Sequence, residues 1–348
     1  MALPLPTHQF TIPSLYDNIL LQCRIYHPDH SQPRDREFAW IQKGAIIAHP
    51  YAPLGGCYDD PVVATVASEL LRAGYVVGTF NLRGASGSQG RTSWTARPEL
   101  GDFISFYAFL VFYILGLKPL SKPTCVPAAE SNSSVDKTNP PSIIVSGYSY
   151  GSMLASYLPT LRSIQLVFAE SRENDTPARI MQRAWSLSSK WNKECWVQNG
   201  IISEPESPDP CTRIARMEKI NISYLLITPI LPPISFFTAT SLFTPTSRLT
   251  TTINGKYLQS SDLRDKVLEH ETLAIFGNKD GFTSSKKLIS WCEELTKKEG
   301  SRFNSVMVRG AGHFWHEDGS KSQMKKAIRE WVAKNHVYYS GMQELSQC

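Results

Sequence analysis

The hydrophobic residues of the chain fall into short runs separated by longer segments in which apolar and polar residues are mixed. Runs of this kind are typical of strands buried on both faces of a sheet. Strands that alternate with helices predict a mostly parallel sheet with helices packed on it. The sequence therefore predicts an α/β fold, with strands expected at residues 44–50, 75–80, 142–147, 222–235, 271–277 and 304–310.

Between these runs, apolar positions recur at helical spacing. In the segment from residue 60 to 73, for example, Val62, Val66 and Leu70 fall on one stripe, and Gly74 ends the pattern. The chain opens differently, with two alternating segments at residues 9–14 and 19–27 that predict an antiparallel pair. We expect the remaining helices at residues 99–117, 149–158, 286–295 and 323–334.

Two segments interrupt this alternation. Residues 118–142 are rich in Pro, Ser, Asn and Ala, which predicts an exposed flexible loop. Residues 160–220 exceed a minimal crossover, and within them Thr176-Pro177 marks the start of an amphipathic helix that carries Trp185. We expect this second segment to form a cap or lid inserted in a single domain spanning residues 1–348.

The stretch at residues 103–117 is uncharged and strongly apolar. A membrane span needs roughly 20 such residues, so this stretch is short for one. We interpret it as a helix buried between the sheet and its neighbours, and keep peripheral membrane contact as the alternative.

Composition narrows the possible functions. The 348 residues are 42% hydrophobic and 19% charged, with a net charge of +5 that is scattered along the chain. This is typical of a globular protein and gives no nucleic-acid-binding signature. The seven cysteines include no pair at the C-x-x-C spacing, so we expect neither a disulfide framework nor a zinc site. The first ten residues lack the features of a secretory signal, and we expect a cytoplasmic location.

The pentapeptide Gly147-Tyr-Ser-Tyr-Gly151 follows a predicted strand and precedes a predicted helix. A serine between two glycines at a strand-to-helix corner is the pattern of a nucleophile elbow, in which strain lifts the hydroxyl clear of the sheet. Ser149 would be the nucleophile. The backbone N–H of Tyr150, at the start of the helix, could donate to a developing oxyanion.

A serine hydroxyl needs a base, and the base needs an acid that orients it. Asp280 follows the strand predicted at 271–277, and His313 follows the strand predicted at 304–310, in the chain order that suits a triad with Ser149. Taken singly, Asp280 could be a turn residue and His313 a loop histidine. The rival base is His49, which we place around the substrate pocket instead. Cys57 is a weak rival nucleophile, since no base is placed for it.

Two glycine-rich loops also follow strands. In residues 49–56, the N–H of Tyr51 would supply the second oxyanion donor, because Pro50 has none, and Gly55 and Gly56 would let the loop turn back. After residue 80, the glycine spacing is not G-x-G-x-x-G, which favours a tight loop over a nucleotide site.

With these motifs the chain resembles the α/β-hydrolase superfamily, and within it a group of microbial and fungal hydrolases. The resemblance covers nearly the whole chain, and its motifs are AHPYAPLGG, FNLRGASGSQG, GYSYGS, FGNKDGFTS and GAGHFW. It implies an α/β-hydrolase fold with Ser149 as nucleophile, His313 as base and Asp280 as its orienting acid. It also implies an oxyanion hole made by the amides of Tyr51 and Tyr150.

The expected activity is that of a serine hydrolase, an esterase or thioesterase that needs no metal or cofactor. Aromatic residues near the motifs favour a hydrophobic small-molecule substrate. An acyltransferase, cyclase or lyase with the same triad, or a ligand-binding protein on this scaffold, remain alternatives. The residues expected to line the substrate pocket are His49, Tyr148, Trp185, Phe314 and Trp315.

Overall fold

The computed structural model describes residues 3–28, 42–118, 140–198, 214–231, 250–253, 256–259 and 263–345. The strands are β1 (His8–Pro13), β2 (Leu20–Tyr26), β3 (Lys43–Ala48), β4 (Val76–Phe80), β5 (Ser142–Tyr148), β6 (Asn221–Ile227), β7 (Thr250–Ile253), β8 (Lys256–Gln259), β9 (Thr272–Lys279) and β10 (Phe303–Gly312). The α-helices are α1 (Pro61–Arg72), α2 (Arg97–Gly116), α3 (Tyr150–Tyr157), α4 (Leu161–Ala169), α5 (Thr176–Gln198), α7 (Leu263–Glu269), α8 (Ser285–Thr296) and α9 (Ser320–Leu345). The described residues also contain two 3₁₀ turns, η2 (Ala52–Leu54) and η3 (Arg216–Lys219).

Eight strands form one sheet in the order β1-β2-β4-β3-β5-β6-β9-β10. Strand β2 is antiparallel to both β1 and β4, and every later pair in the sheet is parallel. The predicted opening hairpin and the parallel sheet are therefore both confirmed. Because β5 is central, its carboxyl end is flanked by the ends of β3 and β6.

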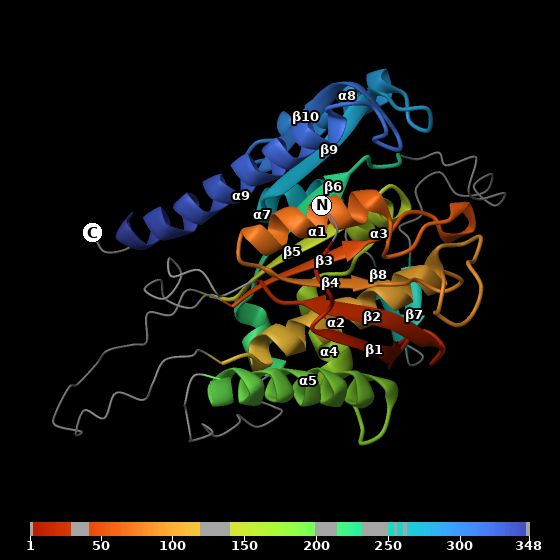
Figure 1. The fold of residues 1–348 in the computed structure, drawn as a ribbon, viewed down its shortest axis with the longest axis vertical. Helices are drawn as coiled ribbons and strands as arrows, with labels where there is room; N and C mark the ends of the chain where they lie inside the picture. The colour runs from red at the N-terminus through yellow and green to blue at the C-terminus, as the bar shows by residue number, and fades with distance from the viewer. Residues whose placement is uncertain are drawn as a thin grey trace.

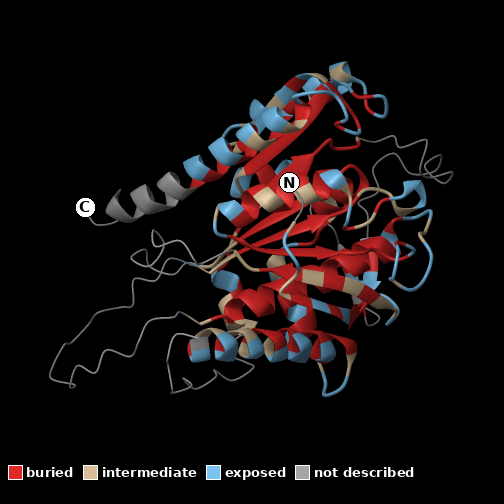
Figure 2. Cartoon of the chain, in the orientation of Figure 1, coloured by how far each residue is buried: buried red, intermediate tan, exposed pale blue. Residues whose placement is uncertain are grey.

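Helices cover both faces of this sheet (Figure 1). Helices α1 and α9 pack together over one face, where their apolar side chains and those of the strands form one buried cluster. Helices α2, α3 and α8 contribute to a larger cluster on the opposite face. Figure 2 shows the resulting pattern, with buried strands between helices whose outer surfaces are exposed.

Helix α2 lies inside the protein. Its length and composition would suit a membrane span, but 94% of its most apolar window is buried within the fold. Its side chains pack against the sheet on one side and against α5 on the other. The interpretation of residues 103–117 as part of a buried helix is confirmed.

The described part of the 160–220 insertion contains α4, α5 and η3. Helix α5 packs along α2 and beside β1, and forms an outer layer on the side of the sheet that α2 covers (Figure 1). The prediction of a helix starting at Thr176 is confirmed. Helices α4 and α7 and the β7–β8 hairpin were not expected from the sequence. Residues 119–139 and 199–213, which include most of the predicted flexible loop and part of the predicted cap, lie outside the described residues.

Candidate active site

Ser149 occupies the corner between β5 and α3. Its backbone has φ 56° and ψ −114°, a conformation that a residue with a Cβ rarely adopts. The corner is held by a hydrogen bond from the Ser149 N–H to the carbonyl of Ile227 at the end of β6 (2.9 Å). Strain of this kind persists only where the surroundings impose it, and it is typical of functional sites.

The two glycines around Ser149 are required by close packing. A Cβ on Gly151 would lie 2.6 Å from the carbonyl oxygen of His49 and closer still to that of Ala48. A Cβ on Gly147 would meet the backbone of Gly151 at under 3.0 Å. The start of α3 can therefore lie against the ends of both β3 and β5 only because these two positions lack a side chain.

The structure brings Ser149, His313 and Asp280 together. The Ser149 Oγ lies 2.8 Å from His313 Nε2, and His313 Nδ1 lies 2.9 Å from Asp280 Oδ2. All three side chains are buried. The carboxylate can only accept, so Nδ1 carries the ring proton, and Nε2 is left to accept from the serine hydroxyl.

Asp280 is fixed by its own loop. Its second oxygen, Oδ1, accepts hydrogen bonds from the N–H groups of Phe282 (2.7 Å) and Thr283 (3.1 Å). The turn chemistry expected of an Asp-Gly pair is thus present, and it aims the other carboxylate oxygen at His313. Asp280 is therefore at once a turn residue, through Oδ1, and the hydrogen-bond partner of His313, through Oδ2.

Buried aromatic residues hold the His313 loop from the side of the core. The hydroxyl of Tyr148 donates to the His313 carbonyl oxygen (2.8 Å), and burial raises the pKa of this phenol. Two residues after His313, the indole N–H of Trp315 donates to Thr228 Oγ1 (2.8 Å). Thr228 and Trp315, which follow β6 and β10, both have positive φ, so the backbone is strained on both sides of this hydrogen bond.

These contacts correct two predictions of pocket-lining residues. Tyr148 is 2% exposed and Trp315 is 1% exposed, and both belong to the core cluster under α1 and α9. Their rings fill the space beneath the site, and their polar atoms anchor the loop that carries His313.

His49 is also buried, and its ring joins two loops instead of lining a pocket. Its Nε2 accepts a hydrogen bond from the Leu82 N–H (2.9 Å), and its Nδ1 lies 2.6 Å from the carbonyl oxygen of Pro50. Because Nε2 is an acceptor, the proton resides on Nδ1. Burial lowers the pKa of the His49 imidazole from its ordinary value of 6.5 to about 4. The ring is therefore neutral near pH 7. It cannot serve as the base in place of His313, because its Nε2 already accepts from Leu82 and its Nδ1 carries the proton, whereas His313 holds the hydrogen bond to Ser149.

The buried His49 predicts a pH dependence of stability. Its pKa is lower in the folded than in the unfolded chain, so the unfolded chain binds more protons between about pH 4 and 6.5. The stability that follows from keeping His49 neutral is fully present above pH 6.5. As the pH falls toward 4 this stability is lost, and the free energy of unfolding decreases by about 3 kcal/mol at most. We expect the difference in unfolding free energy between wild type and His49→Gln, measured in urea, to shrink between about pH 7 and about pH 5. A constant difference would contradict the prediction.

Tyr51, on the loop after β3, lies beside Tyr150, at the start of α3. Tyr51 precedes η2, and Tyr150 is the first residue of α3, where a backbone N–H has no acceptor within its own helix. Their rings meet edge to face with centroids 5.2 Å apart. Gly55 has φ 89°, and a Cβ on Gly56 would collide with the Pro50 carbonyl, so this loop turns back as the sequence predicted.

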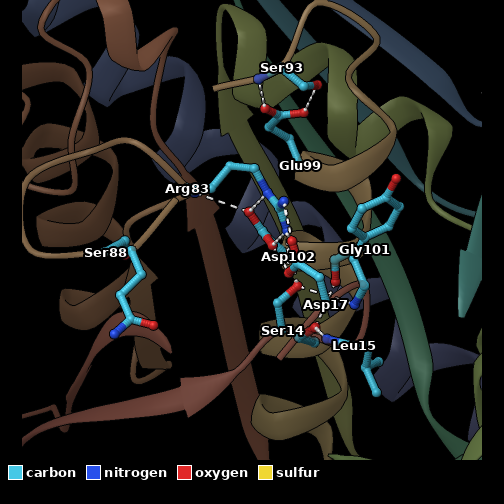
Figure 3. A network of polar contacts seen from close by, with 12 residues as sticks. Ser14, Leu15, Asp17, Arg83, Ser88, Ser93, Glu99, Gly101 and Asp102 are labelled. Carbon is cyan, nitrogen blue, oxygen red and sulfur yellow. Dashed lines mark hydrogen bonds and ion pairs between the residues drawn. The ribbon is translucent and has the colours of Figure 1, made fainter. Parts of the chain in front are cut away.

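The loop after β4 is held by a buried ionic network (Figure 3). Arg83 donates to both oxygens of Asp102 on α2, from Nε (2.9 Å) and Nη2 (2.7 Å). Its guanidinium also donates to Asp17, and Ser14 donates to Asp102 (2.6 Å). Burial raises the pKa of Asp102, and the neighbouring Arg83 opposes that shift. The network ties this loop to α2 and to the β1–β2 turn, which agrees with a tight loop rather than a nucleotide site.

Trp185 does not reach the site. It lies on α5 and contacts Phe112 edge to face (6.2 Å), in the second half of α2. That end of α2 faces the amino edge of the sheet, because Gln42, just before β3, donates to the carbonyl of Ile114 (2.9 Å). Ser149 lies at the opposite, carboxyl edge. The prediction that Trp185 lines the substrate pocket is therefore corrected: its ring seals α5 onto α2.

Two phenylalanine rings flank His313 on its outer side. Phe314, a predicted pocket residue, is 51% exposed, and its ring centroid lies 5.3 Å from that of His313. Phe282 was not predicted. Its centroid lies 4.2 Å from His313, and it is 37% exposed. The available signal was its place two residues after Asp280, in a loop that must approach the histidine.

Among the described residues, no group of three or more His, Cys, Asp or Glu side chains is placed to hold a metal ion. The cysteines that the structure describes, Cys23, Cys57, Cys195 and Cys292, are not in disulfides.

No protein-family model and no curated protein sequence matches the chain. Solved structures resemble it in fold. A protein of unknown function from Agrobacterium tumefaciens, named as a putative alpha/beta hydrolase, has a TM-score of 0.50 and 16% identity over 94% of this chain and 96% of its own. An alpha-beta serine hydrolase homologue from Coxiella burnetii (TM-score 0.48, 14% identity) covers 94% of this chain and 99% of its own, and Thermogutta terrifontis esterase 2 (TM-score 0.48, 16% identity) covers 95% of each.

The sheet order, the strained serine after the central strand and the first of these likenesses define the class. The chain has the α/β-hydrolase fold, as its sequence motifs implied.

Proposed function

We propose that the protein is a serine hydrolase that cleaves a carboxylic ester or thioester of a hydrophobic small molecule through an acyl-enzyme on Ser149. One observation carries the proposal: a strained serine hydroxyl lies 2.8 Å from a histidine nitrogen whose other nitrogen is 2.9 Å from a buried carboxylate. Each part alone has an ordinary structural explanation. The three together, in this order and protonation pattern, are suited to nucleophilic catalysis.

In the first half-reaction, Ser149 Oγ forms a bond to the carbonyl carbon, and its proton passes to His313 Nε2. Asp280 stabilises the imidazolium that results, without taking the proton itself. The bond from the carbonyl carbon to the leaving oxygen or sulfur then breaks, and His313 gives its proton to that atom. In the second half-reaction, water attacks the acyl group, and His313 again takes and returns a proton, which frees the acid and Ser149.

The oxyanion formed in both halves needs donors on the side of the carbonyl away from His313. We assign this role to the backbone N–H groups of Tyr150, at the start of α3, and Tyr51, after β3. The N-terminal end of a helix favours negative charge. The buried His49 supports the arrangement, because it fixes the Tyr51 loop against the loop after β4. Donors held in advance in this way supply much of the rate enhancement in acyl transfer.

A hydrophobic substrate is favoured by the side chains that remain partly exposed near the triad. Phe282 and Phe314, whose rings contact His313, are two of them. Burial of aromatic side chains by a ligand stabilises binding, and a few polar groups then fix its orientation.

The proposal is tested by pre-steady-state kinetics with p-nitrophenyl esters of increasing acyl length. If an acyl-enzyme forms, about one equivalent of p-nitrophenolate per protein should appear in a fast phase, followed by slower turnover. Ser149→Ala should abolish both phases, with an unchanged circular dichroism spectrum. A folded wild-type protein that releases no p-nitrophenolate from any ester of the series would overturn the proposal.

A further inference from the structure

The two phenylalanines beside His313 come from separate loops and meet there. Phe282 belongs to the loop between β9 and α8, and Phe314 to the loop between β10 and α9. Their rings are edge to face with centroids 5.8 Å apart, and each also lies against the imidazole, Phe282 at 4.2 Å and Phe314 at 5.3 Å. The outer side of the proposed base is thus covered by an aromatic pair.

This pair stays exposed while the polar groups beneath it are buried. Phe282 is 37% and Phe314 is 51% exposed, against 6% for His313 and 4% for Ser149. Large apolar side chains on neighbouring loops leave surface that a ligand can cover. By contrast, Tyr148 and Trp315 lie on the buried side of the same histidine and have no exposed surface to offer. The aromatic pair is therefore exposed apolar surface beside this histidine that a substrate can cover.

The chemistry of the proposed reaction says which part of the substrate lies there. His313 must give its proton to the leaving oxygen or sulfur, so that atom has to lie within hydrogen-bond reach of Nε2. Whatever is attached to that atom then extends past the imidazole. The acyl group stays bonded to Ser149 and projects from the other side of the carbonyl carbon.

We infer that Phe282 and Phe314 form the subsite for the leaving group and favour esters of aromatic alcohols. The inference rests on the proposed function. It adds that selectivity arises on the leaving-group side of the substrate. The bond that breaks is the one from the carbonyl carbon to the aryl-bearing oxygen. That oxygen leaves with the proton of His313, and water later completes the hydrolysis. Edge-to-face and offset contacts of a third ring with this pair supply the preference.

The test compares benzyl and methyl esters of the same carboxylic acid. Both esters give the same acyl-enzyme, so the deacylation step is identical for the two substrates. The two alcohols also have similar acidity, so they are similar as leaving groups. We expect Phe282→Ala and Phe314→Ala each to lower kcat/KM for the benzyl ester by about tenfold, and that for the methyl ester by less than about twofold. Phe282→Leu, which keeps an apolar side chain without a ring, should give an intermediate loss for the benzyl ester.

A matched control is Ile289→Ala on α8. Ile289 has the same exposed fraction as Phe282, 37%, and follows the same loop, but it lies on the outer surface of a helix. Ile289→Ala should leave kcat/KM unchanged for both esters. The deacylation rate of the common acyl-enzyme should be the same in all of these variants, because the leaving group has already departed.

Several outcomes would overturn the inference. Equal losses for benzyl and methyl esters would mean that the two rings only hold His313 in place. In the p-nitrophenyl series, losses that grow with acyl chain length would place the pair on the acyl side. If the wild type hydrolyses neither these esters nor any p-nitrophenyl ester, the proposed function itself fails, which distinguishes the two cases.

Discussion

Replacing Asp280 with Asn is expected to lower kcat by about four orders of magnitude while leaving the protein folded. The carboxamide oxygen can still accept from the N–H groups of Phe282 and Thr283, so the loop should keep its shape. The amide nitrogen would face His313 Nδ1 and donate to it. The imidazole would then carry its proton on Nε2, where it can no longer accept the proton of Ser149. Hydrolysis of a p-nitrophenyl ester measures the loss.

A suitable control is Asp318→Asn, the same change on an exposed side chain five residues after His313. It should keep activity within about twofold of wild type, since exposed carboxylates contribute little to local energetics. Near-normal activity of the Asp280→Asn protein would show that a different carboxylate orients His313.

Gly151→Ala is expected to destabilise the protein by about 3 kcal/mol or more, at the upper end of the cost of overpacking. The added methyl would press on the backbone carbonyls of Ala48 and His49, neither of which can rotate away as a side chain could. To make room, α3 would have to move off β3 and carry Ser149 with it. Both the unfolding free energy in urea and the ester hydrolysis rate should therefore fall.

Gly281→Ala is the matched control for that stability measurement. No atom lies within 4 Å of the position that its Cβ would take, and its φ is not in the left-handed region. Its unfolding free energy should stay within about 0.5 kcal/mol of wild type, as for ordinary surface changes. A Gly151→Ala protein as stable as Gly281→Ala would contradict the close packing at the corner.

Much of the fold could be predicted from the sequence because its central strands, such as β3, β4 and β5, are buried on both faces. Apolar runs of strand length located all six parallel strands, and glycine or proline marked several helix boundaries. The β7–β8 hairpin and α7 were missed because their strands and helix are short, with little periodicity to read. The hydrogen-bonded serine, histidine and aspartate could be found because the carboxyl ends of parallel strands meet at one edge.

The surroundings of the triad were harder to predict, since an aromatic residue next to a motif can face the core or the solvent. Tyr148 and Phe314 both neighbour a proposed catalytic residue, yet one is buried and the other is half exposed. Strand register and loop conformation decide between these outcomes, and neither is encoded in local composition. Trp185 illustrates a related limit: the helical stripe gave its buried face correctly but not the helix that this face would meet.

The central claim is that Ser149 is an activated nucleophile, and labelling with a fluorophosphonate probe tests it most directly. The wild type should take up one probe per chain, mapped to Ser149 by mass spectrometry of its peptides. Ser149→Ala should take up none, whereas Ser152→Ala, which removes a buried hydroxyl one turn further along α3, should react like wild type. Labelling at another residue, or no labelling of folded wild-type protein, would contradict the account.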